Sequence, residues 1–435
     1  MISDKIKSGF NGLIKIPGDK SISHRSIIIP SISKGISEIN NILMSDDVLH
    51  TLKAFQALGV KIENKNNKIF IHGNGLNSLS QSKKDIYLGN SGTSARLLTG
   101  LLSSQSFDTV IHGDKSLSSR PMKRIIDPLK LMGAEFESVS EKLPLKIKGK
   151  KLTNSEIKIE IPSAQIKSGI MLAAINTFGK SKIIERNITR DHTENMLKAF
   201  GAKINIEQNK SETSITIEGK QELKANKIDI PSDLSSSAFF IVAALINEGS
   251  KISIQNVNIN PTRDGILKAL KIMGANIIIK NKRIISGEIV GDLDIEHSKL
   301  IGCELDKDMA KLMIDEYPIL SVAAAFANSP SIFRGLNELK VKESDRLELI
   351  RLNLFRCGCE CEVINDDLII KPSKIYSVKN RNIRTDYDHR IAMSFAVMGT
   401  KVGNLKIEDS KSIGTSFPNF KEIFNKAGGN FLWKK

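Results

Sequence analysis

Aromatic residues are scarce in this chain, and cysteines are few. Phenylalanine, tyrosine and tryptophan make up 5% of the 435 residues, and only four residues are cysteine. The net charge of +16 would suit a nucleic-acid-binding protein, but such surfaces usually combine arginine clusters with aromatic side chains on which bases stack. The composition therefore argues against a nucleic-acid partner, and we interpret most of the charge as lysines on solvated faces.

Three of the four cysteines stand close together, at Cys357, Cys359 and Cys361 in the segment CGCECEV. Alternate positions on a strand would place these thiols on one face of a sheet rather than around a tetrahedral metal ion, and no histidine stands nearby as a fourth ligand. We expect buried thiols in a reducing compartment, without a bound metal.

Long apolar segments are missing as well. No run approaches the length of about 20 residues that a membrane helix needs. The first residues, MISDKIKSGFNG, contain neither the apolar core of a signal peptide nor an arginine- and serine-rich transit pattern. The sequence therefore predicts a soluble cytoplasmic protein without a membrane partner.

Arginine is the scarcer basic residue, with 15 copies against 49 lysines. Many of these arginines stand in polar loops next to predicted helix starts. A guanidinium group binds carboxylate or phosphate in a bidentate manner that an ammonium group cannot reproduce. Their placement indicates binding sites for carboxylate or phosphate groups.

A repeated pattern runs along the whole sequence. Six times, an apolar helix-like segment ends in glycine and continues directly into an alternating, strand-like segment. The glycines recur at intervals of about 70 residues, at Gly59, Gly133, Gly201, Gly274, Gly358 and Gly428. Because glycine closes helices with a positive φ, each copy predicts a helix end followed by a strand. Six copies indicate one supersecondary unit used six times.

A second series of polar residues runs in phase with these glycines, each at the start of an apolar helical segment. Its members are Ser21, Ser91, Ser163, Ser232, Asp315 and Asp388. Serine and aspartate side chains satisfy the N–H groups at the start of a helix, so we expect these residues to be N-caps. Each unit would then carry two helices, with strands between and after them.

The chain is too long for one hydrophobic core, and two domains of three units each are the natural division. A strand-like segment at residues 14–16 precedes the first helix and is free to pair with the last units. We therefore expect one domain over residues 18–228 and a discontinuous second domain over 1–17 and 229–435. Each would be an α/β domain whose three units are related by pseudo-threefold symmetry.

Polar loops at the predicted helix starts contain the candidate functional residues. They read GDKSISHRS, GNSGTSAR, SLSSRPMKR, PSAQIKSG, TRDHTE, NPTRDG, DEYP, KESDR and DYDHR. Helix N-termini and basic side chains together form anion sites. A carboxylate among cations, such as Asp315 or Glu343, is more often part of a structural salt bridge, and that alternative stays open for each. If the loops of both halves face one cleft, it suits a small substrate with several negative charges.

Eight segments occur in one order over the whole chain: GDKSISHR, LGNSGTSAR, RPM, SAQIKS, TRDHTE, DEYP, KESDR and DHRIAM. Together they closely resemble the 5-enolpyruvylshikimate-3-phosphate synthase family. The resemblance implies two domains of three βαβαββ units each, with the active site in the cleft between them. It also implies transfer of the enolpyruvyl group of phosphoenolpyruvate to the 5-hydroxyl of shikimate 3-phosphate, in the shikimate pathway, by a monomer that needs no metal or organic cofactor.

The resemblance also implies the roles of individual residues. Asp315 would be the base near the 5-hydroxyl, Glu343 the proton donor and acceptor at the methylene carbon, and Lys20 a cation that assists proton transfer, with their division of labour left open. Shikimate 3-phosphate would be held by Lys20, Ser21, Arg25, Ser163, Ala164, Gln165, Arg190, Asp315 and Lys342. Phosphoenolpyruvate would be held by Lys20, Gly92, Arg120, Gln165, Arg346 and Arg390.

Two features depart from the family's pattern. Some members have a lysine just before a Thr-Phe-Pro near the C-terminus, where this chain reads IGTSFP with Thr415 at the corresponding place, and Lys411 is an alternative contact. Several motifs resemble a subgroup that tolerates the inhibitor glyphosate, yet Gly92 is the small residue usual in sensitive members. The sequence leaves glyphosate sensitivity open.

Two other functions compete with this one. UDP-N-acetylglucosamine enolpyruvyl transferase shares the fold and the donor, but it typically has a cysteine in the loop before the arginine matched by Arg120, and GDKSLSSRP contains none. A basic RNA-binding protein of the same repeat architecture would not need Lys20, Asp315 and Glu343 together with three arginines. Salt-dependent affinity for RNA would identify such a protein.

Overall fold

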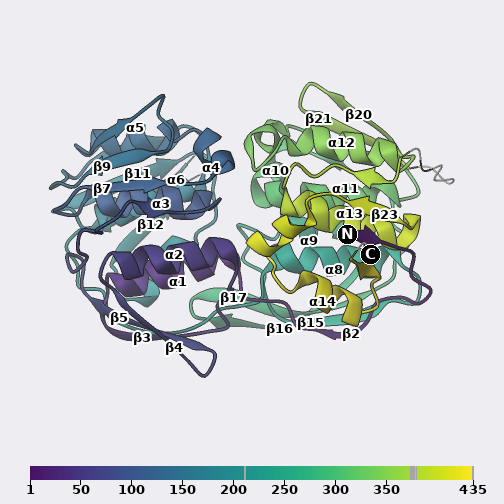
Figure 1. Ribbon diagram of the computed structural model, residues 1–435, viewed down its shortest axis with the longest axis horizontal. Coiled ribbons are helices and arrows are strands. Elements are labelled where there is room, and N and C mark those ends of the chain that lie inside the picture. Colours follow the sequence, from purple (N-terminus) through teal and green to yellow (C-terminus); the bar gives the residue numbers. More distant parts are fainter. Residues whose placement is uncertain (210–211, 373–377, 379, 434–435) are drawn as a thin grey trace. The chain divides into compact units, whose positions relative to one another are not determined.

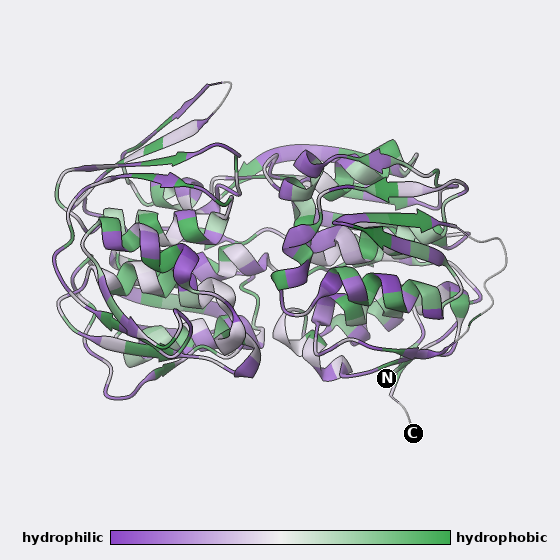
Figure 2. Ribbon diagram, turned by 90° about the horizontal axis from the view of Figure 1, so that it is seen from above, coloured by the Kyte–Doolittle hydropathy of each residue, from purple (hydrophilic) through white to green (hydrophobic). Residues whose placement is uncertain are grey.

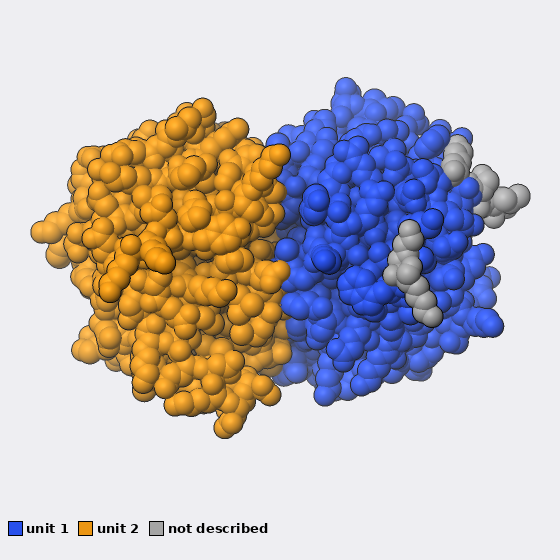
Figure 3. Space-filling view, viewed as in Figure 1, with its two compact units in different colours: residues 1–17, 231–283, 289–435 blue, residues 18–230, 284–288 orange. Residues whose placement is uncertain are grey.

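The computed structural model describes residues 1–209, 212–372, 378 and 380–433. The chain forms two compact units, each with a hydrophobic core of its own (Figure 3). Unit 1 comprises residues 1–17, 231–283 and 289–435, and unit 2 comprises residues 18–230 and 284–288. The expected boundaries differ from this division at residues 229–230 and 284–288, which belong to unit 2.

Each unit contains three four-stranded sheets with one common order of strands. The third repeat consists of β10 (Glu156–Ile159), α6 (Ala164–Ala174), β11 (Lys180–Glu185), α7 (His192–Ala199), β12 (Ile204–Gln208) and β13 (Thr213–Glu218), and its sheet has the order β10-β11-β13-β12. β10 and β11 are parallel and the other neighbours antiparallel. A parallel pair needs a crossover, which α6 provides, whereas β12 and β13 need only a short connection. This βαβαββ unit confirms the predicted fold class.

The remaining elements of unit 2 are labelled in Figure 1 where there is room. They are α1 (Lys20–Ser31), β3 (Lys34–Asn40), α2 (Asp46–Ala57), β4 (Lys61–Lys65), β5 (Lys68–Asn74), β6 (Ile86–Tyr87), α3 (Gly92–Ser103), β7 (Thr109–His112), α4 (Lys115–Ser119), α5 (Lys123–Leu131), β8 (Glu135–Ser138), β9 (Leu145–Lys148) and β14 (Lys227–Asp229).

Unit 1 carries the two ends of the described chain. Its elements are β1 (Ile2–Ser3), β2 (Asn11–Ile14), α8 (Leu234–Ile246), β15 (Lys251–Asn258), α9 (Gly265–Ile272), β16 (Asn276–Ile285), β17 (Glu288–Glu296), β18 (Glu304–Leu305), α10 (Lys307–Met313), η1 (Ile314–Glu316), α11 (Tyr317–Ala325), β19 (Ser331–Phe333), η2 (Asn337–Val341), α12 (Arg346–Arg356), β20 (Glu360–Ile364), β21 (Asp367–Lys371), β22 (Asn382–Ile383), α13 (His389–Val402), β23 (Leu405–Ile407), η3 (Ser410–Thr415), α14 (Phe420–Lys426) and β24 (Phe431–Leu432).

The six glycines of the repeated pattern all adopt a positive φ, between 80° and 120°. Each is the second residue after the end of a helix, and the helices are α2, α5, α7, α9, α12 and α14. This is the position at which a residue without a Cβ atom closes a helix at least cost. The predicted helix ends are therefore confirmed.

The predicted N-caps are confirmed at Ser91, Ser163 and Asp388, whose side chains accept hydrogen bonds from the first turns of α3, α6 and α13. The prediction is wrong by one or two residues for α1 and α8, which are capped by Asp19 and Asp233.

Asp315 does not act as a cap. It lies in η1, and its carboxylate is bound by basic side chains from other segments. Pro318 stands in the first turn of α11, where it supplies no N–H group that a cap would have to satisfy. The Asp315 carboxylate therefore pairs with Lys342 and Arg346 instead of capping α11.

Two strands exchange places between the units. β2 precedes α1 in the sequence but pairs with β15 of unit 1, whereas β14 precedes α8 but pairs with β3 of unit 2. β1 pairs with both β23 and β24. We expected the strand at residues 14–16 to join the last units. Instead β2 ends at Ile14 and completes the sheet of β15, β16 and β17. β1 completes the sheet of β22, β23 and β24.

Each repeat combines one buried helix with one that is partly exposed. All thirteen residues of α8 and all nine of α11 are buried, whereas α14 buries only Phe420 and Phe424. Strands such as β10 alternate between exposed and buried residues, so each sheet covers helices with one face and meets solvent with the other. Figure 2 shows the corresponding alternation of hydrophobic and hydrophilic residues along the strands.

The buried helices α3 and α6 approach each other closely at two glycines. A Cβ atom at Gly100 would lie 1.9 Å from the carbonyl oxygen of Gly169, and one at Gly169 would lie 2.7 Å from that of Arg96. The first turns of the two helices are also in contact, because Gln165 Nε2 donates to Thr93 Oγ1 at 3.0 Å. The glycines thus allow two parallel helix starts to lie side by side.

The tip of the hairpin formed by β16 and β17 is part of unit 2. Ser286 Oγ accepts a hydrogen bond from the Asp229 N–H at 2.9 Å, and Glu288 Oε1 lies 2.9 Å from His192 Nδ1. Both side chains of the Glu288–His192 pair are buried. Their burial explains why these few residues associate with unit 2.

All four cysteines are free thiols, and Cys357 and Cys359 are buried. Burial raises the pKa of both thiols to about 12. The expected strand face is wrong, however, because Cys357 is the C-cap of α12 and Gly358 turns the chain with a positive φ. Of the three cysteines of this segment, only Cys361 lies within β20. Within the described residues, no helix combines the length and apolar character required to cross a membrane.

We predict that Gly100→Ala lowers the free energy of unfolding by about 1–3 kcal/mol or more, because the new Cβ meets backbone rather than a movable side chain. The higher helix propensity of alanine offsets only about 1 kcal/mol of this cost. Urea unfolding followed by circular dichroism measures the effect.

Gly92→Ala on the same helix is the matched control. Its Cβ would meet the ends of two arginine side chains, which can move. A Gly100→Ala protein as stable as the Gly92→Ala protein would show that α3 and α6 do not depend on this close approach.

Candidate active site

The first turn of α1 places Lys20 beside a carboxylate of α2. The Asp19 side chain accepts from the Ile22 N–H at 3.0 Å, which fixes the start of the helix at Lys20. Lys20 Nζ lies 3.1 Å from Asp47 Oδ2, and the two side chains are 19% and 10% exposed. A pair this well buried is weakly screened by solvent, so Asp47 sets the position of the Lys20 ammonium group.

One turn further along α1, Arg25 is almost entirely buried, at 3% exposed. Its Nη1 donates to the carbonyl of Ser21 at 2.9 Å, and its Nε and Nη2 donate to Thr193 Oγ1 and Ser168 Oγ, both at 2.7 Å. Burial lowers the pKa of Arg25 to about 10, and Glu194 is the strongest of the groups that oppose this shift. Arg25 is therefore a fixed cation at neutral pH.

Two guanidinium groups flank the start of α3. A Cβ atom at Gly92 would lie 2.7 Å from Arg96 Nη1 and 3.1 Å from Arg120 Nη1. Arg120 also donates from Nη2 to Asn90 Oδ1 and Ser116 Oγ. The missing side chain at Gly92 lets both cations reach a helix N-terminus, which is an arrangement that binds anions.

Gln165 connects the starts of α3 and α6. Its Oε1 accepts from Arg96 Nη1 at 2.9 Å, and it stands directly after Ala164, the first residue of α6. Ser163 caps the same helix. Arg190 lies in the loop before α7, close enough to Arg25 to help lower the pKa of that residue. Unit 2 thus gathers the predicted residues of its half at the starts of parallel helices.

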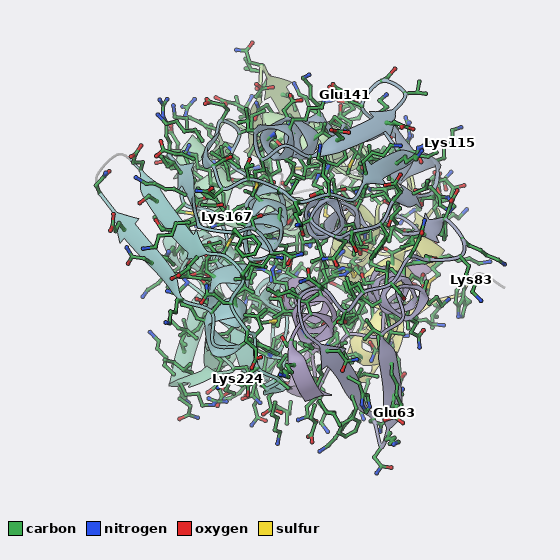
Figure 4. All side chains as sticks on the ribbon, turned by 90° about the vertical axis from the view of Figure 1, so that its left-hand side faces the viewer. Glu63, Lys83, Lys115, Glu141, Lys167 and Lys224 are labelled. Atoms are coloured by element: carbon green, nitrogen blue, oxygen red, sulfur yellow. The ribbon has the colours of Figure 1, made fainter. Side chains whose placement is uncertain are left out.

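Lys167 differs from the other members of its motif, because it does not face an open loop. Its side chain is 1% exposed, and Nζ lies 2.9 Å from Glu185 Oε1 and 2.7 Å from Glu194 Oε1. Figure 4 shows Lys167 among the helices and strands, whereas Lys83 and Glu63 project at the edges. Its role is to pair with buried carboxylates rather than to bind an incoming anion.

Two further motif residues are also structural. The imidazole of His192 is buried against Glu288, as described above. Arg263 is buried and lies 3.0 Å from Asp233, the cap of α8. Both side chains are therefore buried against carboxylates of their own units.

In unit 1, the starts of the three buried helices α8, α11 and α13 meet. Arg390 Nη1, at the start of α13, donates to Ser235 Oγ of α8 at 2.5 Å and to the carbonyl of Asp315 at 3.1 Å. Ser235 donates in turn to the buried carboxylate of Glu316. Arg390 and three helix N-termini bring positive charge to this end of the unit, where the carboxylates of Asp315 and Glu316 also lie.

Arg346, the first residue of α12, binds three carboxylates although its side chain is only 1% exposed. Nε lies 2.8 Å from Asp388 Oδ2, Nη1 3.2 Å from Asp315 Oδ1, and Nη2 2.5 Å from Glu343 Oε2. Burial acts to lower the pKa of Arg346, but the three carboxylates outweigh it and raise the pKa above its ordinary value. The two carboxylates that the sequence singles out therefore share one guanidinium group.

Lys342 adds a second cation to this cluster, with Nζ 3.6 Å from Asp315 Oδ1. The two residues considered for the missing lysine contact differ in position. Thr415 Oγ1 is 3.4 Å from Nδ1 of His389, the neighbour of Asp388 and Arg390. Lys411 instead lines a surface pocket together with Met1 and Trp433.

The two sets of residues differ in chemical character. The set in unit 2 consists mainly of cations, hydroxyl groups and helix N-termini, which bind phosphate and carboxylate groups. The set in unit 1 combines two largely buried carboxylates, 18% and 24% exposed, with basic side chains, so it can exchange protons as well as bind anions. Within residues 1–209, 212–372, 378 and 380–433, no group of histidine, cysteine, aspartate or glutamate side chains is arranged to hold a metal ion.

Sequence reasoning missed the positioning role of three residues, one of which, Asp388, it predicted only as a helix cap. They are Asp47 beside Lys20, Arg96 beside Gln165, and Asp388 beside Arg346. Arg96 stands four residues after Gly92 and so lies on the same helix face, which was a readable signal. The signal for Asp388 was its place just before His389 and Arg390 in DHRIAM, but its pairing with Arg346 spans 42 residues.

Comparisons with known proteins agree with one another over the whole chain. The model of the family described as EPSP synthase (3-phosphoshikimate 1-carboxyvinyltransferase) matches residues 5–424. The 3-phosphoshikimate 1-carboxyvinyltransferases of Bartonella henselae and of Vesicomyosocius okutanii are 46% and 45% identical to this chain, over 424 and 421 residues, which is 96% of each sequence. A solved structure of EPSP synthase from Acinetobacter baumannii is similar with a TM-score of 0.86 and 40% identity, over 98% of each chain.

We predict that Asp388→Ala lowers the free energy of unfolding by about 3–5 kcal/mol, because it leaves a buried guanidinium group short of one partner and removes the cap of α13. Asp388→Asn keeps the cap and should cost less. Urea unfolding of both variants separates the two contributions.

Asp306→Ala is the control, because Asp306 is an exposed cap of α10 that accepts two backbone hydrogen bonds at 3.0 Å. It should cost only about 1 kcal/mol. Equal losses for Asp388→Ala and Asp306→Ala would mean that the ion pair with Arg346 contributes nothing to stability.

Proposed function

The chain belongs to the EPSP synthase family and transfers the enolpyruvyl group of phosphoenolpyruvate to shikimate 3-phosphate, and we propose that the two sets of side chains described above carry out this reaction. Phosphoenolpyruvate is protonated at its methylene carbon while the 5-hydroxyl of the acceptor loses a proton and attacks C2. The tetrahedral intermediate then expels phosphate while its methyl group gives up a proton, which restores the carbon–carbon double bond of the enolpyruvyl group. Proton donors and acceptors are therefore needed on both sides of one carbon atom.

The observation that supports this assignment most strongly is the binding of Asp315 and Glu343 to the same buried guanidinium group. Two carboxylates held by one cation have a fixed separation, which positions one at the hydroxyl and the other at the methylene carbon. Asp315 acts as the base, Glu343 exchanges the proton of the methylene group, and Lys20 assists as a cation.

Shikimate 3-phosphate carries a phosphate and a carboxylate, which match the cations and hydroxyl groups at the helix starts of unit 2. We assign its binding to Lys20, Ser21, Arg25, Ser163, Ala164, Gln165 and Arg190, together with Asp315 and Lys342 of unit 1. Arg25 supports the assignment best, since three hydrogen bonds fix a cation that remains charged at neutral pH.

Phosphoenolpyruvate is the smaller anion, and we assign it to Lys20, Gly92, Arg120, Gln165, Arg346 and Arg390. The close approach of two guanidinium groups to Gly92 supports this assignment, because a helix N-terminus flanked by cations favours a compact, highly charged ligand. The residues assigned to the two substrates belong to both units.

Other properties follow as predictions. We infer a monomer that acts in the cytoplasm without a metal or an organic cofactor, since the phosphate of the donor is already an activated leaving group. The four free thiols are consistent with a reducing compartment.

Phosphate release by the purified protein tests the proposal. We expect release from phosphoenolpyruvate in the presence of shikimate 3-phosphate and none with UDP-N-acetylglucosamine, because the loop before Arg120 contains no cysteine. Release only with UDP-N-acetylglucosamine, or with neither acceptor, would contradict it.

We predict that Glu343→Gln lowers kcat by about 10²–10⁴-fold while substrate affinities change much less, because the residue acts in proton transfer. Steady-state kinetics together with calorimetric binding of shikimate 3-phosphate distinguish the two effects. Equal losses in turnover and affinity would assign Glu343 a binding role instead.

Glu348→Gln provides a matched control for this variant. Glu348 lies on α12 and pairs with Arg351 three residues later, as Glu343 pairs with Arg346, but the Glu348–Arg351 pair is far more exposed. Its removal should leave kcat unchanged.

A further inference from the structure

Two adjacent residues of α6 face two adjacent residues of α7 inside unit 2. Lys167 Nζ lies 2.7 Å from Glu194 Oε1, and Ser168 Oγ lies 2.6 Å from Thr193 Oγ1. All four residues are buried, with at most 1% of each exposed. An ion pair and a pair of hydroxyl groups therefore stand next to each other between the same two helices.

The ion pair fixes the distance between the helices. Lys167 also binds Glu185 Oε1 at 2.9 Å and the carbonyl of Thr189 at 3.1 Å, so its ammonium group has three partners in the interior. Glu185 in turn accepts from the Thr189 hydroxyl at 2.7 Å. Separating α6 from α7 would leave buried charges without partners, which is strongly unfavourable.

The direction of each hydrogen bond in the hydroxyl pair can be assigned. The Ser168 hydroxyl donates to the carbonyl of Ala164 at 2.6 Å, which uses its only proton. Thr193 must therefore donate to Ser168. Each hydroxyl oxygen still has a lone pair that can accept a hydrogen bond. Ser168 Oγ accepts from Arg25 Nη2, and Thr193 Oγ1 accepts from Arg25 Nε.

The two hydroxyl groups thus receive one edge of the Arg25 guanidinium group, while Nη1 is held by the carbonyl of Ser21 in its own helix. A guanidinium group with a partner on every nitrogen cannot rotate freely, and its other N–H groups have fixed directions. An arginine that is preorganised in this way loses little conformational entropy when it binds an anion.

We propose that Ser168 and Thr193 are positioning residues that hold the Arg25 guanidinium group in the orientation that binds shikimate 3-phosphate. The inference rests on the proposed assignment of Arg25 to that substrate. Lys167 and Glu194 support it from the adjacent positions by keeping α6 and α7 at a constant distance.

Thr193→Val tests the proposal, since valine keeps the shape of threonine without its hydroxyl group. We expect the dissociation constant of shikimate 3-phosphate, measured by calorimetry, to rise about tenfold or more, as for loss of a hydrogen bond to a charged group. The KM for shikimate 3-phosphate should rise in parallel, with kcat and the KM for phosphoenolpyruvate within about twofold of the unmodified enzyme.

Two variants serve as controls. Thr193→Ser restores the hydroxyl group and should return the affinity to within about threefold of the unmodified enzyme. Thr177→Val removes a buried hydroxyl group that donates to the Ala173 carbonyl just after α6, and it should leave affinity unchanged. Should Thr193→Val fail to fold, Ser168→Ala removes the second acceptor of Arg25 and is measured in its place.

Arg25→Ala separates the inference from the assignment on which it rests. We expect Arg25→Ala to weaken binding by about 100-fold, and the double variant with Thr193→Val to be no weaker than Arg25→Ala alone. Normal affinity in Arg25→Ala would overturn the substrate assignment and this proposal together. Weak binding in Arg25→Ala with normal affinity in Thr193→Val, or additive losses in the double variant, would overturn the positioning role alone.

Discussion

The arrangement of carboxylates in unit 1 depends on one buried guanidinium group, that of Arg346. Arg346 is the first residue of α12. Its partner Asp315 lies in η1, Glu343 lies in the loop between η2 and α12, and Asp388 directly precedes α13, so one side chain connects these segments. Three carboxylates so close together would repel one another without a central cation. The same contact therefore stabilises the unit and sets the geometry of the two residues assigned to proton transfer.

Both units use the repeat in the same way but add different side chains to it. In each unit, three buried helices bring their N-termini to one end, through the glycine approach of α3 and α6 in unit 2 and through Ser235 and Arg390 in unit 1. The scaffold supplies N–H groups and positive potential in both cases. The loops supply the side chains that differ. In unit 2 these are mainly cations and hydroxyl groups, and in unit 1 they are carboxylates surrounded by cations.

The sequence predicted local features well and long-range pairing poorly. The six glycines and three of the caps were readable because a positive φ or an N-terminal N–H group restricts the residue at that position alone. The sequence predicted that residues 1–17 join unit 1, but not that β2 pairs with β15 or that β14 pairs with β3, since a parallel strand chooses its partner through tertiary contacts. The buried ion pairs of Lys167 were not readable for a similar reason, because its partners Glu185 and Glu194 stand 18 and 27 positions away and only the fold shows that all three are buried.

The pairing of β1 with β23 and β24 has a consequence for the order in which the protein can fold on the ribosome. Ile2 pairs with Lys406 and Leu432, so the first strand to be synthesised must wait for nearly the last. The sheets of unit 2, by contrast, are complete once β14 has emerged, and only the tip at residues 284–288 is still missing. The nascent chain therefore assembles its anion-binding half first. β2 can pair once β15 has emerged, whereas β1 remains unpaired until the synthesis of the carboxylate half approaches its end.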